Sequence, residues 1–91
     1  MSKSKDKKKK NLIDQAEFLW ERAQVQAAGA QKNLDIAVET FKNFIGEMPE
    51  DQVKLTEQKI AEQQETIKDF LMAARDAYAA RLEEASAIIS E

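Results

Sequence analysis

Ile45-Gly46-Glu47-Met48-Pro49-Glu50-Asp51 is the stretch that decides the fold. It contains the only proline and one of the two glycines of a 91-residue chain. Gly46 suits the left-handed position that ends a helix, and Pro49 suits the first position of the next helix. The acids after the proline complement the dipole of that second helix. We therefore predict a hinge at residues 46–49 between two antiparallel helices, rather than one long helix kinked at the proline.

An unbroken apolar stripe precedes the hinge. Its members recur every three or four residues, with a mean step of about 3.6, which is the period of a straight amphipathic α-helix. They are Leu12, Ala16, Leu19, Ala23, Ala27, Ala30, Leu34, Val38, Phe41, Ile45 and Met48. The stripe predicts a helix over about 11–46 that begins at an N-cap, Asn11.

A second apolar line lies on the opposite side of this helix. Phe18, Val25 and Ile36 fall together at 100° per residue, and Gly29 lies beside them. A helical hairpin needs only one apolar face on each helix, and a glycine inside a helix costs about 1 kcal/mol relative to alanine. We therefore expect this face to contact a symmetry mate, another chain or an apolar surface, with Phe18 as the main anchor. The alternative is a set of isolated surface residues.

The second helix is predicted over about 49–89. From Ile60 its apolar stripe follows a coiled-coil heptad, and Gln64 is a polar residue on that seam, where such residues set register or oligomeric state. The stripe consists of Val53, Thr56, Ile60, Gln64, Ile67, Leu71, Ala74, Tyr78, Ala85 and Ile88 or Ile89, with Leu82 alongside. If the hinge centres near Met48, the numbers of facing residues sum to about 97.

The second half of the second helix is a further candidate contact surface. It is rich in alanine, and small side chains let another helix approach closely. Phe70, Ala77 and Ile88 widen the stripe on one flank, and Ala73 adds apolar surface beside Met72. Together with the opposite line of the first helix, these residues form the predicted partner interface.

The segment 1–10 has a charge opposite to that of the rest of the chain. It contains one acid and six lysines: Lys3, Lys5, Lys7, Lys8, Lys9 and Lys10. The remaining 81 residues carry 8 basic and 16 acidic side chains, a charge of -8. The segment has no apolar residue after Met1, so we predict a flexible arm, disordered alone or ordered by a partner. It could contact nucleic-acid phosphates, an anionic membrane or an acidic neighbouring subunit, or it could be a solubilising tail.

Most catalytic chemistries lack their usual residues in this chain. It has no cysteine for disulfide or thiolate chemistry, and no histidine to act as a general base or metal ligand. The two glycines lie too far apart for a phosphate-binding loop. Acids do gather on one helical edge at Glu62, Glu65 and Asp69, which could in principle hold a metal or share a proton. We expect them to be ordinary surface acids, and we expect neither enzymatic activity nor a cofactor.

No apolar run approaches the ~18 residues that a membrane-spanning helix needs, and the N-terminus lacks the apolar core of a signal peptide. We therefore expect the protein in the cytoplasm, or in an assembly formed there. The predicted fold is an all-α, coiled-coil-like hairpin over residues 11–91, preceded by the basic arm. Its function would be structural: a subunit of a filament, virion component or scaffold, built from homo-oligomers or with other proteins of the assembly.

Two other functions fit the same pattern. A small helical adaptor, chaperone or inhibitor would present one helical face to a different protein. An amphipathic coat would lie on an apolar or anionic surface. The stretch AAGAQKNLDIAVETFKNF, residues 27–44, is similar in composition to granule-coating phasins, which implies the coat function. That resemblance covers composition only.

Overall fold

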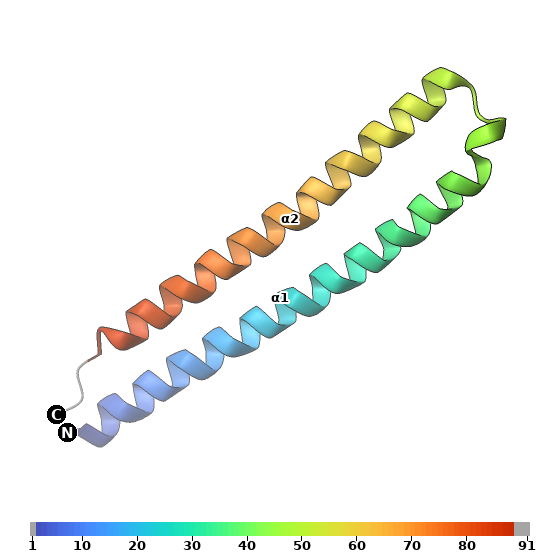
Figure 1. Cartoon of the computed structure of the whole chain (residues 1–91). Helices are drawn as coiled ribbons and strands as arrows, with labels where there is room; N and C mark the ends of the chain where they lie inside the picture. The colour runs from blue at the N-terminus through green and yellow to red at the C-terminus, as the bar shows by residue number, and fades with distance from the viewer. Residues whose placement is uncertain (1, 89–91) are drawn as a thin grey trace.

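The computed structural model describes residues 2–88 and is a helical hairpin (Figure 1). Helix α1 spans Ser2–Phe44, a 3-10 turn η1 spans Ile45–Glu47, and helix α2 spans Glu50–Ser86. The two helices lie side by side and run in opposite directions, with the hinge at one end and the N-terminus at the other. The predicted all-α hairpin is confirmed.

The hairpin is long and thin. Its principal extents are 70 × 16 × 9 Å, and its radius of gyration is 20.6 Å, against about 12 Å expected for a compact domain of this length. Each long helix therefore has one helical neighbour. A helix packed on one side only can bury one stripe, and its other faces remain exposed.

The hinge is made by a 3-10 turn rather than by a left-handed glycine. The Met48 N–H donates to the Ile45 carbonyl at 3.3 Å, and Met48 is extended at φ −93°, ψ 143°. Among the described residues none has a positive φ, so the left-handed conformation predicted for Gly46 is wrong. The tighter i→i+3 bond satisfies the Ile45 carbonyl, directly after α1, without that conformation, and extended Met48 then turns the chain.

Pro49 lies one position earlier than predicted. It is the N-cap of α2, with φ −60° and ψ 148°, and Glu50 is the first helical residue. The Pro49 carbonyl accepts the first helical bond, from the Val53 N–H at 3.0 Å. Its fixed φ suits this half-helical position as well as the first turn itself. Glu50 and Asp51 do lie in the first turn, where they complement the dipole.

The outer ends of both helices differ from the prediction. Helix α1 begins at Ser2, so Asn11 is interior and not an N-cap. Lysine is a good helix former, and neither glycine nor proline interrupts residues 2–10. The basic segment is thus a helical extension of α1 in the described structure, and its flexibility stays a prediction. Helix α2 ends at Ser86, whose hydroxyl donates to the Glu83 carbonyl at 2.8 Å and competes with the helical pattern there.

Small side chains form the core. The buried residues are Ala16, Ala23, Ala27, Leu34 and Ala85. All five belong to the predicted stripes. Within the described part of the chain no large side chain is fully buried. Most other stripe residues are half-buried, but Leu19, Ala30, Ile45 and Gln64 are exposed. Leu19 lies at the edge of its stripe, and a two-helix structure has no third element to cover that edge.

Two side-chain contacts show how the helices are aligned. Gln31 and Gln64 exchange amide hydrogen bonds: Gln31 Nε2 donates to Gln64 Oε1 at 2.9 Å, and Gln64 Nε2 donates to Gln31 Oε1 at 2.7 Å. Trp20 stacks on Tyr78 with ring centroids 5.8 Å apart and planes 16° apart. The residue numbers of these pairs sum to 95 and 98, on either side of the predicted value. Gln64 is exposed, yet it pairs across the seam as a register-setting residue should.

Gly46→Ala should leave the hairpin intact. An added Cβ at Gly46 would meet no atom within 4 Å, and the backbone there is not left-handed. Alanine also restricts the unfolded chain more than glycine, so we expect a gain of about 0.4–1 kcal/mol in the free energy of unfolding. Urea denaturation followed by circular dichroism measures this change. A loss of more than 1 kcal/mol would instead favour a left-handed glycine cap.

The glutamine pair should show a measurable coupling energy. Gln31→Ala, Gln64→Ala and the double variant form a double-mutant cycle. We expect a coupling of about 0.5–1.5 kcal/mol, because the two hydrogen bonds form only when both amides are present. Gln31→Ala also removes the bond from Gln31 Nε2 to Asp35 Oδ1 at 3.0 Å, which the cycle cancels. Additive single effects would show that the pair does not couple the helices.

Candidate interaction surface

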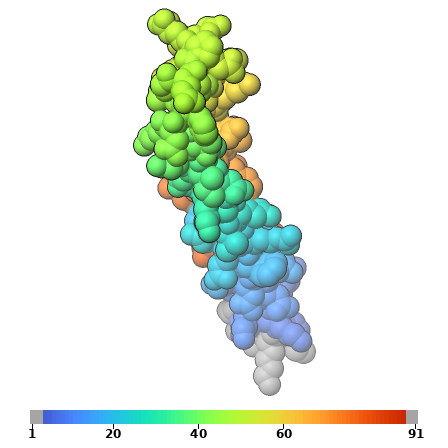
Figure 2. Space-filling view, turned by 90° about the vertical axis from the view of Figure 1, so that its right-hand side faces the viewer, coloured from blue at the N-terminus to red at the C-terminus, as the bar shows by residue number. Residues whose placement is uncertain are grey.

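The outer face of α1 carries the apolar line predicted from the sequence. Phe18, Val25 and Ile36 are 61%, 72% and 57% exposed. At 100° per residue they lie opposite the buried Ala16, Ala23, Ala27 and Leu34. Figure 2 views the molecule from a side on which α1 lies in front and α2 largely behind it. The line is therefore left uncovered by the rest of the described chain.

Gly29 lies on the same line and has no role in packing α1 against α2. A Cβ added there would meet nothing within 4 Å, and the residue does not have a positive φ. A glycine in a helix interior normally weakens the helix. The close-packing reason predicted for Gly29 is thus not found within the hairpin, and a second molecule would have to supply it.

The predicted residues of α2 do not form one continuous patch. Phe70 is 41% exposed, and Ala73 is exposed, whereas Ala77 is half-buried and Ile88, also half-buried, lies beyond the end of α2 at Ser86. The predicted partner interface does not include Leu55, although Leu55 is an exposed apolar residue. Leu55 lies between two stripe residues of α2, Val53 and Thr56, and at 100° per residue it points away from both. An apolar residue that falls outside the predicted stripe is the sequence feature that could have identified Leu55 as exposed.

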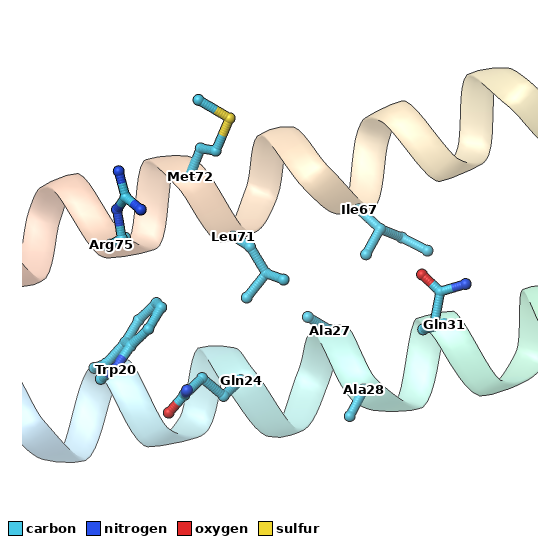
Figure 3. A pocket seen from close by; sticks show the side chains of 9 residues that line it. All are labelled: Trp20, Gln24, Ala27, Ala28, Gln31, Ile67, Leu71, Met72 and Arg75. Carbon is cyan, nitrogen blue, oxygen red and sulfur yellow. The ribbon is translucent and has the colours of Figure 1, made fainter.

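Two open apolar grooves flank the seam. One has a volume of about 480 Å³, and Figure 3 shows Trp20 and Ala27 reaching toward Leu71 within it, while Met72 points away from α1. The other, about 280 Å³, is lined by Gln26, Ala27, Ala30, Thr66, Ile67 and Phe70. Ala27 and Ile67 line both grooves. The small alanines of α1 leave this space beside the larger side chains of α2.

The two ends of the hairpin carry opposite charges. Lys7, Lys8 and Lys10 are exposed near the start of α1, and Lys9 is half-buried. Lys5 makes further contacts within the chain. Lys3 lies in the first turn of α1. The acids Glu47, Glu50 and Asp51 are exposed at the hinge, at the far end of the molecule (Figure 1). The basic N-terminal end of the hairpin, called the basic root below, and the acidic hinge are thus about one molecular length apart.

Within residues 2–88 no group of three or more acids is placed to hold a metal ion, so Glu62, Glu65 and Asp69 do not form such a site. No buried side-chain nitrogen or oxygen in this part of the chain lacks a hydrogen-bond partner. None of the described helices is long and apolar enough to cross a membrane. The features that remain for binding are the outer line of α1, the grooves and the two charged ends.

Comparison with known proteins gives no assignment. No protein-family model, no curated protein and no solved structure matches the chain. A proposed function therefore has to rest on the surface features described above.

Replacing Lys7, Lys8, Lys9 and Lys10 by glutamine should weaken binding to polyanions. Counterion release makes binding to single-stranded nucleic acid depend on salt, with a slope of about −0.7 for each phosphate contacted. We expect the variant to elute from a nucleic-acid or heparin column at lower salt than the wild type. The matched control replaces four lysines outside the basic end, Lys42, Lys54, Lys59 and Lys68, and should elute like the wild type. Equal shifts in both variants would show that net charge, rather than the basic end, controls retention.

Proposed function

We propose that this chain is a non-enzymatic structural protein whose hairpins associate with one another, or within a larger complex such as a filament, virion or scaffold. The observation that carries the proposal is the uncovered line of Phe18, Val25 and Ile36, opposite the buried face of α1. A solvated helix face does not need three large apolar side chains in register. A face that packs against another helix does.

The energetics of the hairpin support association. The buried residues are four alanines and one leucine, and small domains without disulfides or metals are marginally stable. Fully burying one large apolar side chain contributes about 1.5–3 kcal/mol. Covering three such side chains therefore contributes several kcal/mol per chain, which helps offset the loss of translational and rotational freedom. Association would bury apolar side chains that stay exposed in the single hairpin.

A second candidate function is a helical adaptor that binds a different protein. The open groove beside Phe70 favours it, because an apolar helix face or an extended peptide could lie along such a groove. A stoichiometric foreign protein that co-purifies with the chain, and that is lost on Phe70→Ser but kept on Phe18→Ser, would favour the adaptor. An amphipathic coat would instead bind an apolar particle through Phe18 and Val25.

Phe18→Ser combined with Val25→Ser should dissolve the assembly without unfolding the hairpin. Both side chains are mostly exposed, so the loss of internal packing is small. We expect the wild type to sediment as an oligomer at tens of micromolar, and the double variant as a monomer of unchanged helicity by circular dichroism. Phe44→Ser is the matched control, because Phe44 is 54% exposed but lies off the line.

Two outcomes would contradict this proposal. A strictly monomeric wild type that unfolds cooperatively would remove self-association. If helicity collapses in the Phe18→Ser, Val25→Ser variant but not in Phe44→Ser, the outer line belongs to the fold and not to an interface.

A further inference from the structure

The outer line of α1 has an internal symmetry. Reading along α1 into the hinge, the residues of this face are Lys7, Asn11, Phe18, Val25, Gly29, Ile36, Asn43 and Glu47. The steps between them are 4, 7, 7, 4, 7, 7 and 4, which read the same in both directions. At 100° per residue, the members up to Asn43 lie within an arc of about 40°. The helical period gives any narrow face this spacing, so the spacing alone does not single out the line; an isologous, two-fold interface also requires that the paired residues match in chemistry.

The chemistry of the line is also paired about its centre. Each residue and its counterpart have numbers that sum to 54, so the counterparts face one another when two α1 helices pack antiparallel. Phe18 then lies level with Ile36 of a second copy, and Val25 with Gly29. Apolar residues thus meet apolar residues, and the glycine leaves room for the valine. This gives Gly29 the close approach that it lacks inside the hairpin.

The polar ends of the line match as well. Asn11 lies level with Asn43 of the second copy, and two amides can exchange hydrogen bonds. Lys7 lies level with Glu47, and the other exposed lysines of that end lie near the hinge acids. Lys32 and Glu21 lie on the same flank of the line. A two-fold axis between antiparallel helices brings the same flank of both copies together, so Lys32 of one copy lies beside Glu21 of the other. All of these side chains are exposed in the single hairpin.

We propose that two copies of this chain form an antiparallel, two-fold dimer through the outer face of α1, centred at the level of Ala27, with the basic root of each copy against the acidic hinge of the other. This inference rests on the proposed self-association and specifies its geometry. Residues 7–47 span about 60 Å, and a strip ~10 Å wide would bury about 600 Å² on each copy. The total of about 1,200 Å² is within the range of specific interfaces.

Cysteine cross-linking tests the orientation, because the chain has no cysteine of its own. A Glu21→Cys protein is mixed with a tagged Lys32→Cys protein and treated with a short bismaleimide. Neither change touches the apolar line. In the proposed dimer positions 21 and 32 of different copies are neighbours, while two copies of position 21 lie about 18 Å apart along the axis. We expect the mixed cross-link to exceed either like-with-like product by about tenfold, since only it joins adjacent positions.

A charge swap tests the same geometry without cross-linking. Lys7→Glu alone and Glu47→Lys alone should each weaken dimerisation about threefold to tenfold, by placing like charges together at both ends of the interface. Lys7→Glu with Glu47→Lys in one chain should restore the wild-type dissociation constant, because the swapped charges meet again across the two-fold axis. Sedimentation at low salt measures all three.

The outcomes separate this inference from the proposed function. Like-with-like cross-links in an oligomeric protein would overturn the antiparallel dimer and leave self-association standing. If the protein is an oligomer but the double charge swap does not restore the wild-type dissociation constant, the pairing of the basic root with the acidic hinge is overturned. A monomeric wild type that gives no cross-link would overturn both proposals, and a foreign protein on the outer face would do the same.

Discussion

The contact between α1 and α2 depends on small side chains. Ala16, Ala23, Ala27 and Ala85 let the helices approach, and among the described residues Leu34 is the only larger one buried with them. A two-helix structure made this way is 70 Å long and has no third layer. Large side chains at the edge of the seam are half-covered, and those on the outer face of α1 are 57–72% exposed. The grooves beside Ala27 and the exposed line on α1 both follow from this constraint.

A seam of alanines is poor at fixing register, because small side chains can slide past one another. The structure places two specific contacts along it: the reciprocal amide pair of Gln31 and Gln64, and the stacked rings of Trp20 and Tyr78. The polar pair limits sliding, because a shifted register would separate the two amides. The hinge adds a third restraint. These contacts fix which face of α1 is turned toward α2, and therefore which face is turned outward.

Hydrophobic periodicity was sufficient to predict the hairpin, its approximate register and the five buried residues. It failed where local backbone chemistry decides the outcome. Gly46 is a strong stop signal, but a stop signal does not reveal whether the turn is left-handed or 3-10. The lysines at the N-terminus have good helix propensity and no apolar side chain, so composition alone did not predict that α1 would include them. Leu19 was assigned to the core because it follows the period, although its edge position leaves it 41% exposed. The exposed line of Phe18, Val25 and Ile36 was predicted correctly because it lies directly opposite the seam.

The central claim of this account is that the hairpin completes its hydrophobic burial by association. Its most direct test is the melting temperature of the wild-type chain, measured by circular dichroism over a hundredfold range of protein concentration. Association through an otherwise exposed face predicts a melting temperature that rises by about 5–10 °C over that range, because mass action stabilises the bound state. A melting temperature that is independent of concentration, in a single cooperative transition of a monomer, would contradict the account.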